Sequence, residues 1–366
     1  MMTGDRPAGG LRVGVIGVGF GATMHIPAFI SEGWAIAGVW SRRVERAREA
    51  AAQHGVETVH EDWRELVERD DVDAVAVATP PSAHLEIVSA ALRAGKHVLC
   101  EKPFALDAAQ AEQMRALAEA SGLTAMVAHE FRFAPQRAHI KQLLEEGYIG
   151  RPTVATTELF VGRPAPATPP PMNWNGEAAQ GGGTLFALGS HYVDAYRHWF
   201  GEVVSVSGAV RSLRPDRTDP STDAVVQADA DDTFAATFTF ASGVTATLFT
   251  STAVAPSQGG RMFIAGSEGA LLATQRTPNP APEGVVLGAK AGDAALAELP
   301  MPAAFAPFED DRDERMLSFR LLVREFERGI RAGTSPAPNF EDGLRNQQLL
   351  DAVRVSSRDG RTVPIE

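Results

Sequence analysis

Three closely spaced glycines that follow a short apolar run constrain this chain more than any other feature. Residues 11–16 are mostly apolar, Gly17, Gly19 and Gly21 come next, and a helix-compatible segment runs from residue 26 to residue 30. A buried parallel strand, a tight turn and the beginning of a helix give this pattern. The chain is therefore expected to open with the strand–turn–helix unit of an α/β protein.

The glycine turn matches the motif G-x-G-x-x-A, with Gly17, Gly19 and Ala22 at the fixed positions. A Cβ at the glycines would hold the backbone away from a pyrophosphate, and the helix N-terminus offers free N–H groups to that anion. The motif alone also fits a plain turn, but its place after an apolar strand favours dinucleotide binding. We expect five residues of the turn to bind the cofactor: Gly17, Gly19, Phe20, Gly21 and Ala22.

Strand and helix patterns alternate over residues 11–129, which predicts a doubly wound parallel α/β sheet of the Rossmann type. Ligands of such sheets bind at the carboxyl ends of the strands. The segments at those ends are the glycine turn, Ser41-Arg42-Arg43, Thr79-Pro80-Pro81, Glu101-Lys102-Pro103 and His129-Glu130. We therefore expect Thr79, Pro80, Glu101 and Lys102 to lie at the cofactor.

The end of the second strand carries information on which nicotinamide cofactor is bound. An acidic residue at this place would bind the ribose 2′-hydroxyl of NAD, but this chain has Ser41, Arg42 and Arg43. A hydroxyl and two guanidinium groups suit a 2′-phosphate, so we expect NADP to be preferred over NAD. The alternative is that both arginines only begin a solvated helix.

Composition excludes several classes of protein. The 366 residues suffice for two domains, and 34 basic against 46 acidic residues give a net charge of −12, which argues against non-specific nucleic-acid binding. No apolar run approaches the roughly 20 residues of a membrane helix, and the polar residues 1–10 are expected to be a disordered leader without a secretion signal. The single Cys100 fits a reducing, cytoplasmic setting, and no Cys/His spacing predicts a metal site.

Beyond residue 129 the pattern changes to that of an α+β domain with a largely antiparallel sheet, extending over residues 130–366. Residues 232–240 and 244–252 alternate as a hairpin, whereas residues 275–310 are rich in Ala, Pro and Gly and are expected to be surface loops. Helices are expected near residues 314–332 and up to residue 357. Since the alternating strands carry many threonines on one side, pairing with a second subunit in a dimer or tetramer is expected.

Taken in order, the motifs of this chain resemble the Gfo/Idh/MocA group of oxidoreductases. The resemblance spans residues 11–366 and depends on the glycine turn and on five further segments. These are residues 78–84 (ATPPSAH), 95–103 (GKHVLCEKP), 131–135 (FRFAP), 181–194 (from GGG to His191 and Asp194) and 340–343 (FEDG). The resemblance implies NAD or NADP as cofactor and a sugar, cyclitol or related polyol as substrate.

The resemblance also implies roles for individual residues. Lys102 takes the place of the family lysine that reaches the substrate hydroxyl and the nicotinamide, and His191 that of the histidine that acts as, or helps, the general acid/base. An ammonium can polarise a carbonyl or relay a proton during hydride transfer. His84 is expected at the cofactor, the alternative being a surface histidine. Candidate substrate contacts are Arg132, Trp174 and Asp194.

One position departs from the family pattern. The family usually has Asp four residues before the histidine, where this chain has Ala187. Asp194 could substitute, although the resemblance treats it as a helix-anchoring position. Three functions therefore stay open: an NADP-preferring dehydrogenase or reductase, a non-catalytic NAD(P)-binding sensor, and a glycoside-cleaving enzyme with tightly held cofactor.

Overall fold

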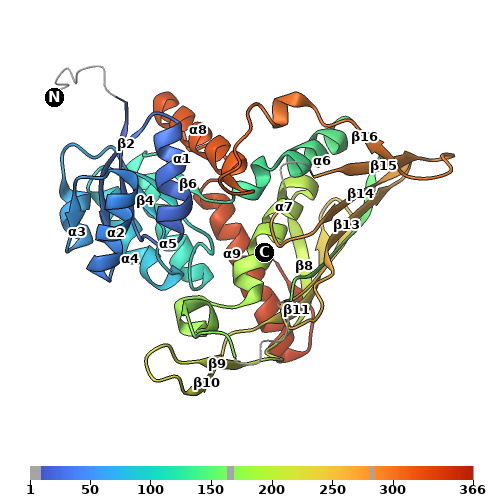
Figure 1. Ribbon diagram of the computed structural model, residues 1–366. Coiled ribbons are helices and arrows are strands. Elements are labelled where there is room, and N and C mark those ends of the chain that lie inside the picture. The colour runs from blue at the N-terminus through green and yellow to red at the C-terminus, as the bar shows by residue number, and fades with distance from the viewer. Residues whose placement is uncertain (1–9, 163–168, 281–283, 366) are drawn as a thin grey trace. The chain divides into compact units, whose positions relative to one another are not determined.

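The computed structural model describes residues 10–162, 169–280 and 284–365, which form two compact units (Figure 1). Residues 1–9 of the expected leader lie outside the described residues. The first unit consists of the chain up to Glu101, Glu112–Ala128 and Phe319–Glu341, and the second consists of Lys102–Ala111, His129–Ser318 and the chain from Asp342 onward. The chain returns to the first unit late in the sequence, with Phe319–Glu341.

A parallel six-stranded sheet forms the centre of the first unit, as expected. Its order is β3-β2-β1-β4-β5-β6, with bounds Val59–His60, Ala35–Trp40, Arg12–Ile16, Ala74–Val77, His97–Cys100 and Ala125–Val127. The helices α1 to α5 are Ile26–Ser31, Val44–His54, Trp63–Glu68, His84–Arg93 and Ala108–Ser121. Strand β4 is buried along its whole length, as in a sheet covered on both faces. The strand order reverses between β1 and β4, the place where such sheets bind ligands.

Helix α8 (Met316–Ala332) completes the first unit from a distant part of the sequence. Trp34 Nε1 donates to Glu327 at 2.9 Å, and its ring stacks on Phe326. The carboxylate of Glu32 accepts from Arg320 at 2.7 Å and from Arg324 at 2.6 Å. These contacts explain why residues 319–341 belong to the first unit although they follow the whole second-unit sheet.

The second unit is built on a nine-stranded sheet in which only β12 and β7 pair in parallel. Its order is β16-β15-β14-β13-β7-β12-β11-β8-β17, with bounds Ala297–Leu299, Val286–Lys290, Gly269–Gln275, Gly259–Gly266, Pro152–Phe160, Thr245–Ser251, Thr233–Phe240, Val203–Arg211 and Val363–Pro364. Helices α6 (Pro135–Glu145), α7 (Ser190–Phe200) and α9 (Phe340–Asp359) lie along one face (Figure 1). Phe234, Phe238 and Tyr196 are among the buried side chains of this core. The largely antiparallel sheet of the α+β expectation is thereby confirmed.

The opposite face of this sheet is partly apolar, and no helix of the described residues covers it (Figure 1). Phe249 on β12 is 43% exposed and Val154 on β7 is 38% exposed. Their strand neighbours Thr247 and Thr156 are half-buried. The alternation of buried and outward residues along β11 and β12 agrees with the pattern expected from the sequence.

The expectation that residues 275–310 form only surface loops is wrong. Strands β15 and β16 extend the sheet there, and Val286 is fully buried. The pairing of Leu287 with Leu272 on β14 fixes β15 in place. Such short strands among Ala, Gly and Pro have little alternation of their own, so the pairing partner decides their conformation.

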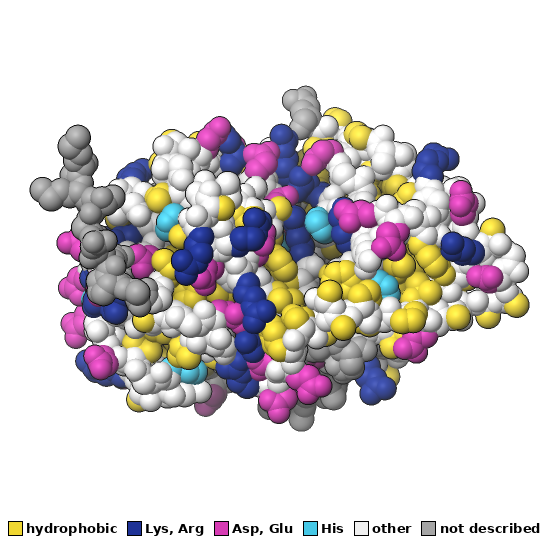
Figure 2. All heavy atoms as spheres, turned by 90° about the horizontal axis from the view of Figure 1, so that it is seen from above, with side chains coloured by type: hydrophobic (Ala, Val, Ile, Leu, Met, Phe, Trp, Pro, Cys, Tyr) yellow, Lys and Arg dark blue, Asp and Glu magenta, His cyan; other side chains and the backbone are white. Residues whose placement is uncertain are grey.

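The charged surface of the described residues is mixed in sign. On the face that Figure 2 shows, lysine and arginine side chains are interspersed with aspartate and glutamate. A nucleic-acid-binding face would present basic residues clustered in a stripe or patch. None of the described helices is long and apolar enough to cross a bilayer.

Candidate functional site

The glycine turn of the first unit is shaped to admit a pyrophosphate. Gly17 has a φ of +103°, and a Cβ on it would overlap the carbonyl group of Ala78. At Gly19 an added Cβ would meet no atom within 4 Å, so the missing side chain leaves open space beside the backbone. The helix that follows begins at Phe20 and winds as a π turn over Gly21–His25. Glycine here serves both the turn and the approach of a ligand.

The segment after β4 presents a polar atom that suits the same ligand. Thr79 Oγ1 is buried and has no hydrogen-bond partner among the described residues. His84, in the first turn of α4, is fully buried, and its Nε2 lies 2.9 Å from the carbonyl oxygen of Thr79. The histidine is therefore not a surface residue; it holds the backbone of the Thr79-Pro80 segment. Together with the glycine turn, this segment fits a dinucleotide cofactor.

Ser41, Arg42 and Arg43 follow β2 directly, at the same edge of the sheet as the glycine turn. Gly17 N donates to the carbonyl oxygen of Trp40 at 2.8 Å, which places the two segments side by side. Arg42 and Arg43 are exposed, and Ser41 is half-buried.

A buried histidine that the sequence analysis did not single out bonds to Glu101. His25 Nε2 lies 2.8 Å from Glu101 Oε1, and both side chains are buried. His25 belongs to the π turn after the glycines, whereas Glu101 is the first residue after β5. The bond therefore joins the cofactor turn to the residue that immediately precedes Lys102. Only the short spacing of His25 from the glycines could have drawn attention to it.

In the second unit, Lys102 is oriented by a backbone carbonyl. Its Nζ donates to the carbonyl oxygen of Ala187 at 3.2 Å. Ala187 lies in a second π turn, Leu185–Gly189, immediately before α7. Turns of this kind are frequent at functional sites. The position where the family has an aspartate thus contacts the lysine through its main chain.

His191, in the first turn of α7, lies on the same helix as Ala187 and is almost completely buried. Its ring stacks on Phe131 at a centroid distance of 3.8 Å, and Nδ1 lies 4.0 Å from Glu130 Oε2. Burial, and then the positive charge of Lys102, lower the pKa of His191 well below its ordinary value of 6.5. The imidazole is therefore neutral at pH 7 and can accept a proton.

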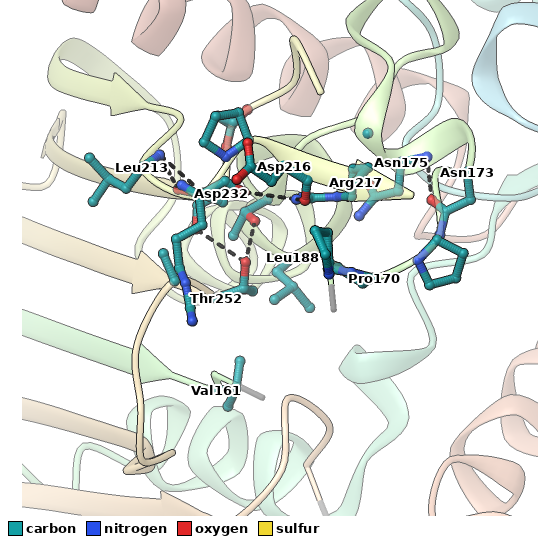
Figure 3. Close-up of a pocket in the computed structure, with 18 of the residues that line it drawn as sticks. Val161, Pro170, Asn173, Asn175, Leu188, Leu213, Asp216, Arg217, Asp232 and Thr252 are labelled. Atoms are coloured by element: carbon teal, nitrogen blue, oxygen red, sulfur yellow. Dashed lines mark hydrogen bonds between the residues drawn. The ribbon is translucent and has the colours of Figure 1, made fainter. Parts of the chain in front are cut away.

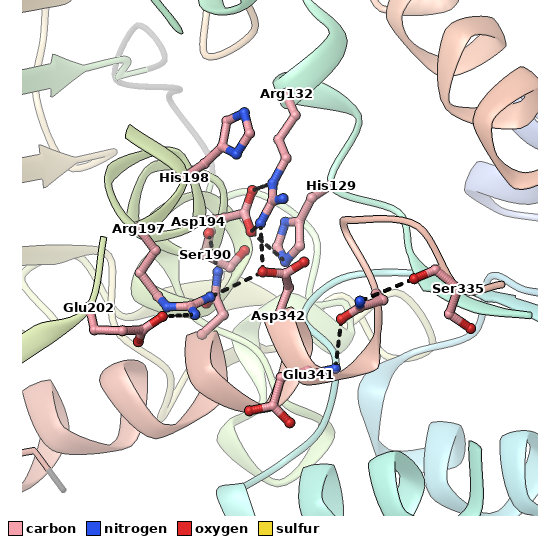
Figure 4. Close-up of polar contacts among 12 residues, drawn as sticks. His129, Arg132, Ser190, Asp194, Arg197, His198, Glu202, Ser335, Glu341 and Asp342 are labelled. Carbon is pink, nitrogen blue, oxygen red and sulfur yellow. Dashed lines mark hydrogen bonds and ion pairs between the residues drawn. The ribbon is translucent and has the colours of Figure 1, made fainter. Parts of the chain in front are cut away.

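Arg132 and Asp194, both expected to contact the substrate, bind each other (Figure 4). Two parallel hydrogen bonds of 2.7 Å join the guanidinium to the carboxylate, and Asp342 lies 3.1 Å from the same guanidinium. Burial alone would raise the pKa of Asp194, but the charge and hydrogen bonds of Arg132 lower it to about 2. The pair anchors α7, the helix that carries His191, to the segment after β6.

Trp174, the remaining candidate substrate contact, is the most exposed of the three. It begins a 3₁₀ turn that Asn173 caps by accepting from Asn175 N at 2.9 Å. Its indole is 37% exposed. Among the described residues, no group of three or more His, Cys, Asp or Glu side chains is arranged to hold a metal ion.

Comparison with known proteins identifies the class to which this fold and site belong. Residues 11–129 match the Gfo/Idh/MocA family described as an oxidoreductase family with an NAD-binding Rossmann fold. Residues 138–272 match the C-terminal domain of the same family. The chain belongs to the Gfo/Idh/MocA family of oxidoreductases.

Relatives of this chain include enzymes and solved structures of similar length. It is 32% identical to the dTDP-3,4-didehydro-2,6-dideoxy-alpha-D-glucose 3-reductase of Actinomadura kijaniata, over 98% of this chain and 99% of that protein. It is 29% identical to the myo-inositol 2-dehydrogenase of Thermotoga maritima, over 97% and 99%. A levoglucosan dehydrogenase in complex with NADH and levoglucosan superposes with a TM-score of 0.88 at 25% identity, over 97% of this chain and 99% of that one.

We expect Asp194→Asn to lower the free energy of unfolding at pH 7 by about 3–5 kcal/mol, because it leaves the buried Arg132 without its main counter-charge. Since the native pKa of Asp194 lies below its ordinary 3.8, the pair stabilises the fold above pH 4 and this contribution is lost as the pH falls towards 2. Urea unfolding should therefore show the two proteins converging in stability over that range.

The control is Glu202→Gln, which removes the partner of Arg197 from a pair of 2.7 Å in which the glutamate is 65% exposed. This change should alter the free energy of unfolding by less than about 1 kcal/mol. Equal effects of the two substitutions would contradict the structural role of the Arg132–Asp194 pair.

Proposed function

We propose that the protein is an NAD(P)-dependent dehydrogenase or reductase that acts on a CH–OH or carbonyl group of a sugar-like or polyol substrate. The observation that carries the proposal is that Lys102 Nζ bonds to the carbonyl oxygen of Ala187, four residues before the neutral His191 in the helical segment that holds both. The glycine turn and Thr79 would hold the cofactor. When bound, the nicotinamide supplies or accepts the hydride.

Lys102 is the group that acts on the substrate oxygen. An ammonium has three N–H donors, so its bond to the carbonyl of Ala187 is compatible with donation to a substrate oxygen. In the direction of reduction the ammonium stabilises negative charge on the oxygen and can deliver a proton to it. In the direction of oxidation it favours loss of the hydroxyl proton.

His191 has an assisting role in this scheme, as a neutral hydrogen-bond partner of the reacting groups. Its low pKa keeps the ring in the neutral, proton-accepting form, and stacking on Phe131 fixes the plane of the ring. A carboxylate at position 187 would have raised the basicity of the imidazole, but Ala187 offers only its carbonyl oxygen, and to Lys102. Lys102 therefore carries the larger share of the proton transfer in this chain.

The relatives support this assignment of substrate class. The enzymes from Actinomadura kijaniata and Thermotoga maritima are named for a reaction on a deoxysugar and on myo-inositol, and the levoglucosan dehydrogenase was solved with NADH and levoglucosan. Each of these compounds carries a hydroxyl or a carbonyl group on a sugar or cyclitol ring. Ala187 favours the second candidate, a non-catalytic NAD(P)-binding sensor, because it removes a side chain that would assist proton transfer.

We also propose that NADP is preferred over NAD. The exposed Arg42 and Arg43, with the Ser41 hydroxyl, can bind a 2′-phosphate at the end of β2, where no carboxylate follows the strand to bind a ribose 2′-hydroxyl. The related levoglucosan dehydrogenase was solved with NADH, so cofactor choice in this chain depends on these three residues.

We propose that two copies pair through the open face of the nine-stranded sheet, as a homodimer or as half of a tetramer. Phe249 and Val154 are exposed on neighbouring strands, and a twofold axis would bring the same patch of two copies together. We further propose a cytoplasmic location, where the lone buried Cys100 stays a thiol; burial raises its pKa well above the ordinary value.

Lys102→Ala is expected to lower kcat by about 10²–10⁴-fold, the usual effect of removing an acid/base or charge-stabilising group. Nicotinamide absorbance should be followed with NADPH and NADH over keto-sugars, inosose and sugar aldehydes. Lys141→Ala is the matched control, because Lys141 Nζ also donates to a backbone carbonyl, that of His198 at 2.8 Å. Lys102→Ala activity within tenfold of the control would refute the role of Lys102, and cofactor binding without any turnover by the unmodified protein would favour the sensor.

The double substitution Arg42→Ala, Arg43→Ala should lower the ratio of kcat/KM for NADPH to that for NADH by about tenfold or more, since each charge-assisted hydrogen bond contributes about 1.5–3 kcal/mol. Arg46→Ala, on the exposed side of α2, is the control and should leave this ratio within about twofold. An unchanged ratio in the double variant would mean that both arginines are solvated helix residues.

Phe249→Glu should convert the protein to monomers in sedimentation velocity, because a charge would be buried in the proposed interface. Val225→Glu, at a hydrophobic residue that is 60% exposed on β10 (Val225–Gln227), should leave the assembly unchanged. A protein that is monomeric before substitution would refute the dimer.

A further inference from the structure

A cavity of about 790 Å³ opens in the second unit beside the helix that carries His191 (Figure 3). Thr184 and Leu188 contribute its inner wall from one helical turn. The outer walls come from prolines 169–171 and from residues 213–217. Cavities of about 300–1,000 Å³ bury drug-sized ligands, so this one has room for more than a single sugar ring.

The cavity lies within one turn of helix of the proposed reacting lysine. Lys102 Nζ is bonded to the carbonyl oxygen of Ala187, which lies between the wall residues Thr184 and Leu188 in sequence. Asp231, in the cavity wall, accepts from Leu185 N at 2.8 Å. Leu185 and Ala187 are about 3 Å apart along the helix axis. Lys102 and Asp231 are therefore both bonded to the main chain of the same π turn.

The two carboxylate oxygens of Asp231 have different surroundings. Oδ2 accepts from Leu185 N, while the backbone carbonyl of Asp231 accepts from Thr184 N at 2.9 Å. Oδ1 lies against Gly183, where any Cβ would overlap it. Glycine at position 183, with a φ of +113°, keeps this oxygen accessible.

The ionised carboxylate of Asp231 does not stabilise the fold. Burial raises the pKa of Asp231 to about 6, although the Leu185 hydrogen bond and the charge of Arg354 act in the opposite direction. Because the native pKa lies above the unfolded one, ionisation lowers stability as the pH rises through 4 to 6. Charged groups held in clefts at a cost to stability are characteristic of functional sites.

The charges of the cavity favour a neutral ligand. Asp216, Asp231 and Asp232 face it together with Arg214 and Arg217. Asp232 is already used, since its carboxylate accepts from the backbone N–H groups of Leu213 and Arg214 at 2.7–3.0 Å. Three carboxylates against two guanidinium groups disfavour a diphosphate, whereas a carboxylate oxygen is a strong acceptor for sugar hydroxyls.

We propose that this cavity is a subsite for a second, neutral sugar ring of a glycosidically linked substrate, with Asp231 Oδ1 accepting hydrogen bonds from its hydroxyls. The proposal deepens the dehydrogenase function above and rests on it. The ring that reacts is held by Lys102, and the linked ring packs between Leu188 and the prolines of the outer wall. Binding energy from this second ring is available to position the first.

The test measures maltose, cellobiose and lactose against glucose and galactose, both by calorimetric binding to the cofactor-loaded protein and by turnover. At least one disaccharide should bind about tenfold more tightly than its monosaccharide. Asp231→Asn keeps an amide oxygen for Leu185 and should lower the disaccharide-to-monosaccharide ratio of affinity, and of kcat/KM, by about tenfold. Asp229→Asn is the control, because Asp229 caps Ala178 N at 2.7 Å from outside the cavity and should leave both ratios within twofold.

The outcomes separate this proposal from the proposed function. Preferential disaccharide binding without turnover would retain the subsite and refute the dehydrogenase. Turnover of monosaccharides, with no disaccharide bound more tightly, would refute the subsite alone. If Asp231→Asn leaves the disaccharide-to-monosaccharide ratio unchanged, Asp231 only caps the helix and does not bind the second ring. If UDP-glucose binds more tightly than any disaccharide, the cavity binds a nucleotide and not a second sugar.

Discussion

The hydrogen bond between Lys102 Nζ and the carbonyl oxygen of Ala187 sets the arrangement of the candidate site. The lysine follows the end of β5 directly in sequence, and the π turn fixes the position of the acceptor. A long, flexible side chain loses much conformational entropy when it is held in one place. A backbone acceptor in a rigid helix meets this requirement without adding a second charge. The absence of a carboxylate at position 187 is therefore compatible with an oriented lysine.

Near this bond, the buried charged and titratable groups around α7 differ in what they bind. Arg132 and Asp194 satisfy each other on one side of the helix, so their charges are not available to a ligand. His191 is kept neutral by burial, and Asp231 is ionised near neutral pH although burial opposes it. Helix α7 and its π turn thus link a structural ion pair, a neutral proton acceptor and an accessible carboxylate within a few turns.

Local sequence patterns predict most of the fold and part of the candidate site. The rest depends on contacts between residues that are far apart in sequence. The glycine turn was predictable because glycine, strand and helix signals fall within 20 residues. The pairing of Arg132 with Asp194 was not, since a lone arginine and a lone aspartate 62 positions apart can equally well face a substrate. His25 and Glu101 are 76 positions apart in sequence. The role of Asp231 depends on its hydrogen bond to Leu185 N, which the sequence alone does not indicate. Strands β15 and β16 likewise depend on their neighbour β14.

The contribution of α8 to the first unit bears on how the protein is made. The chain crosses between the two units after residues 101, 111, 128, 318 and 341. During synthesis the first-unit sheet emerges early, but Trp34 can contact Phe326, and Glu32 can contact Arg320 and Arg324, only after residues 320–326 have left the ribosome. The first unit is therefore completed only after the second-unit sheet has been translated, and a gene fragment that stops near residue 129 would encode it without this helix.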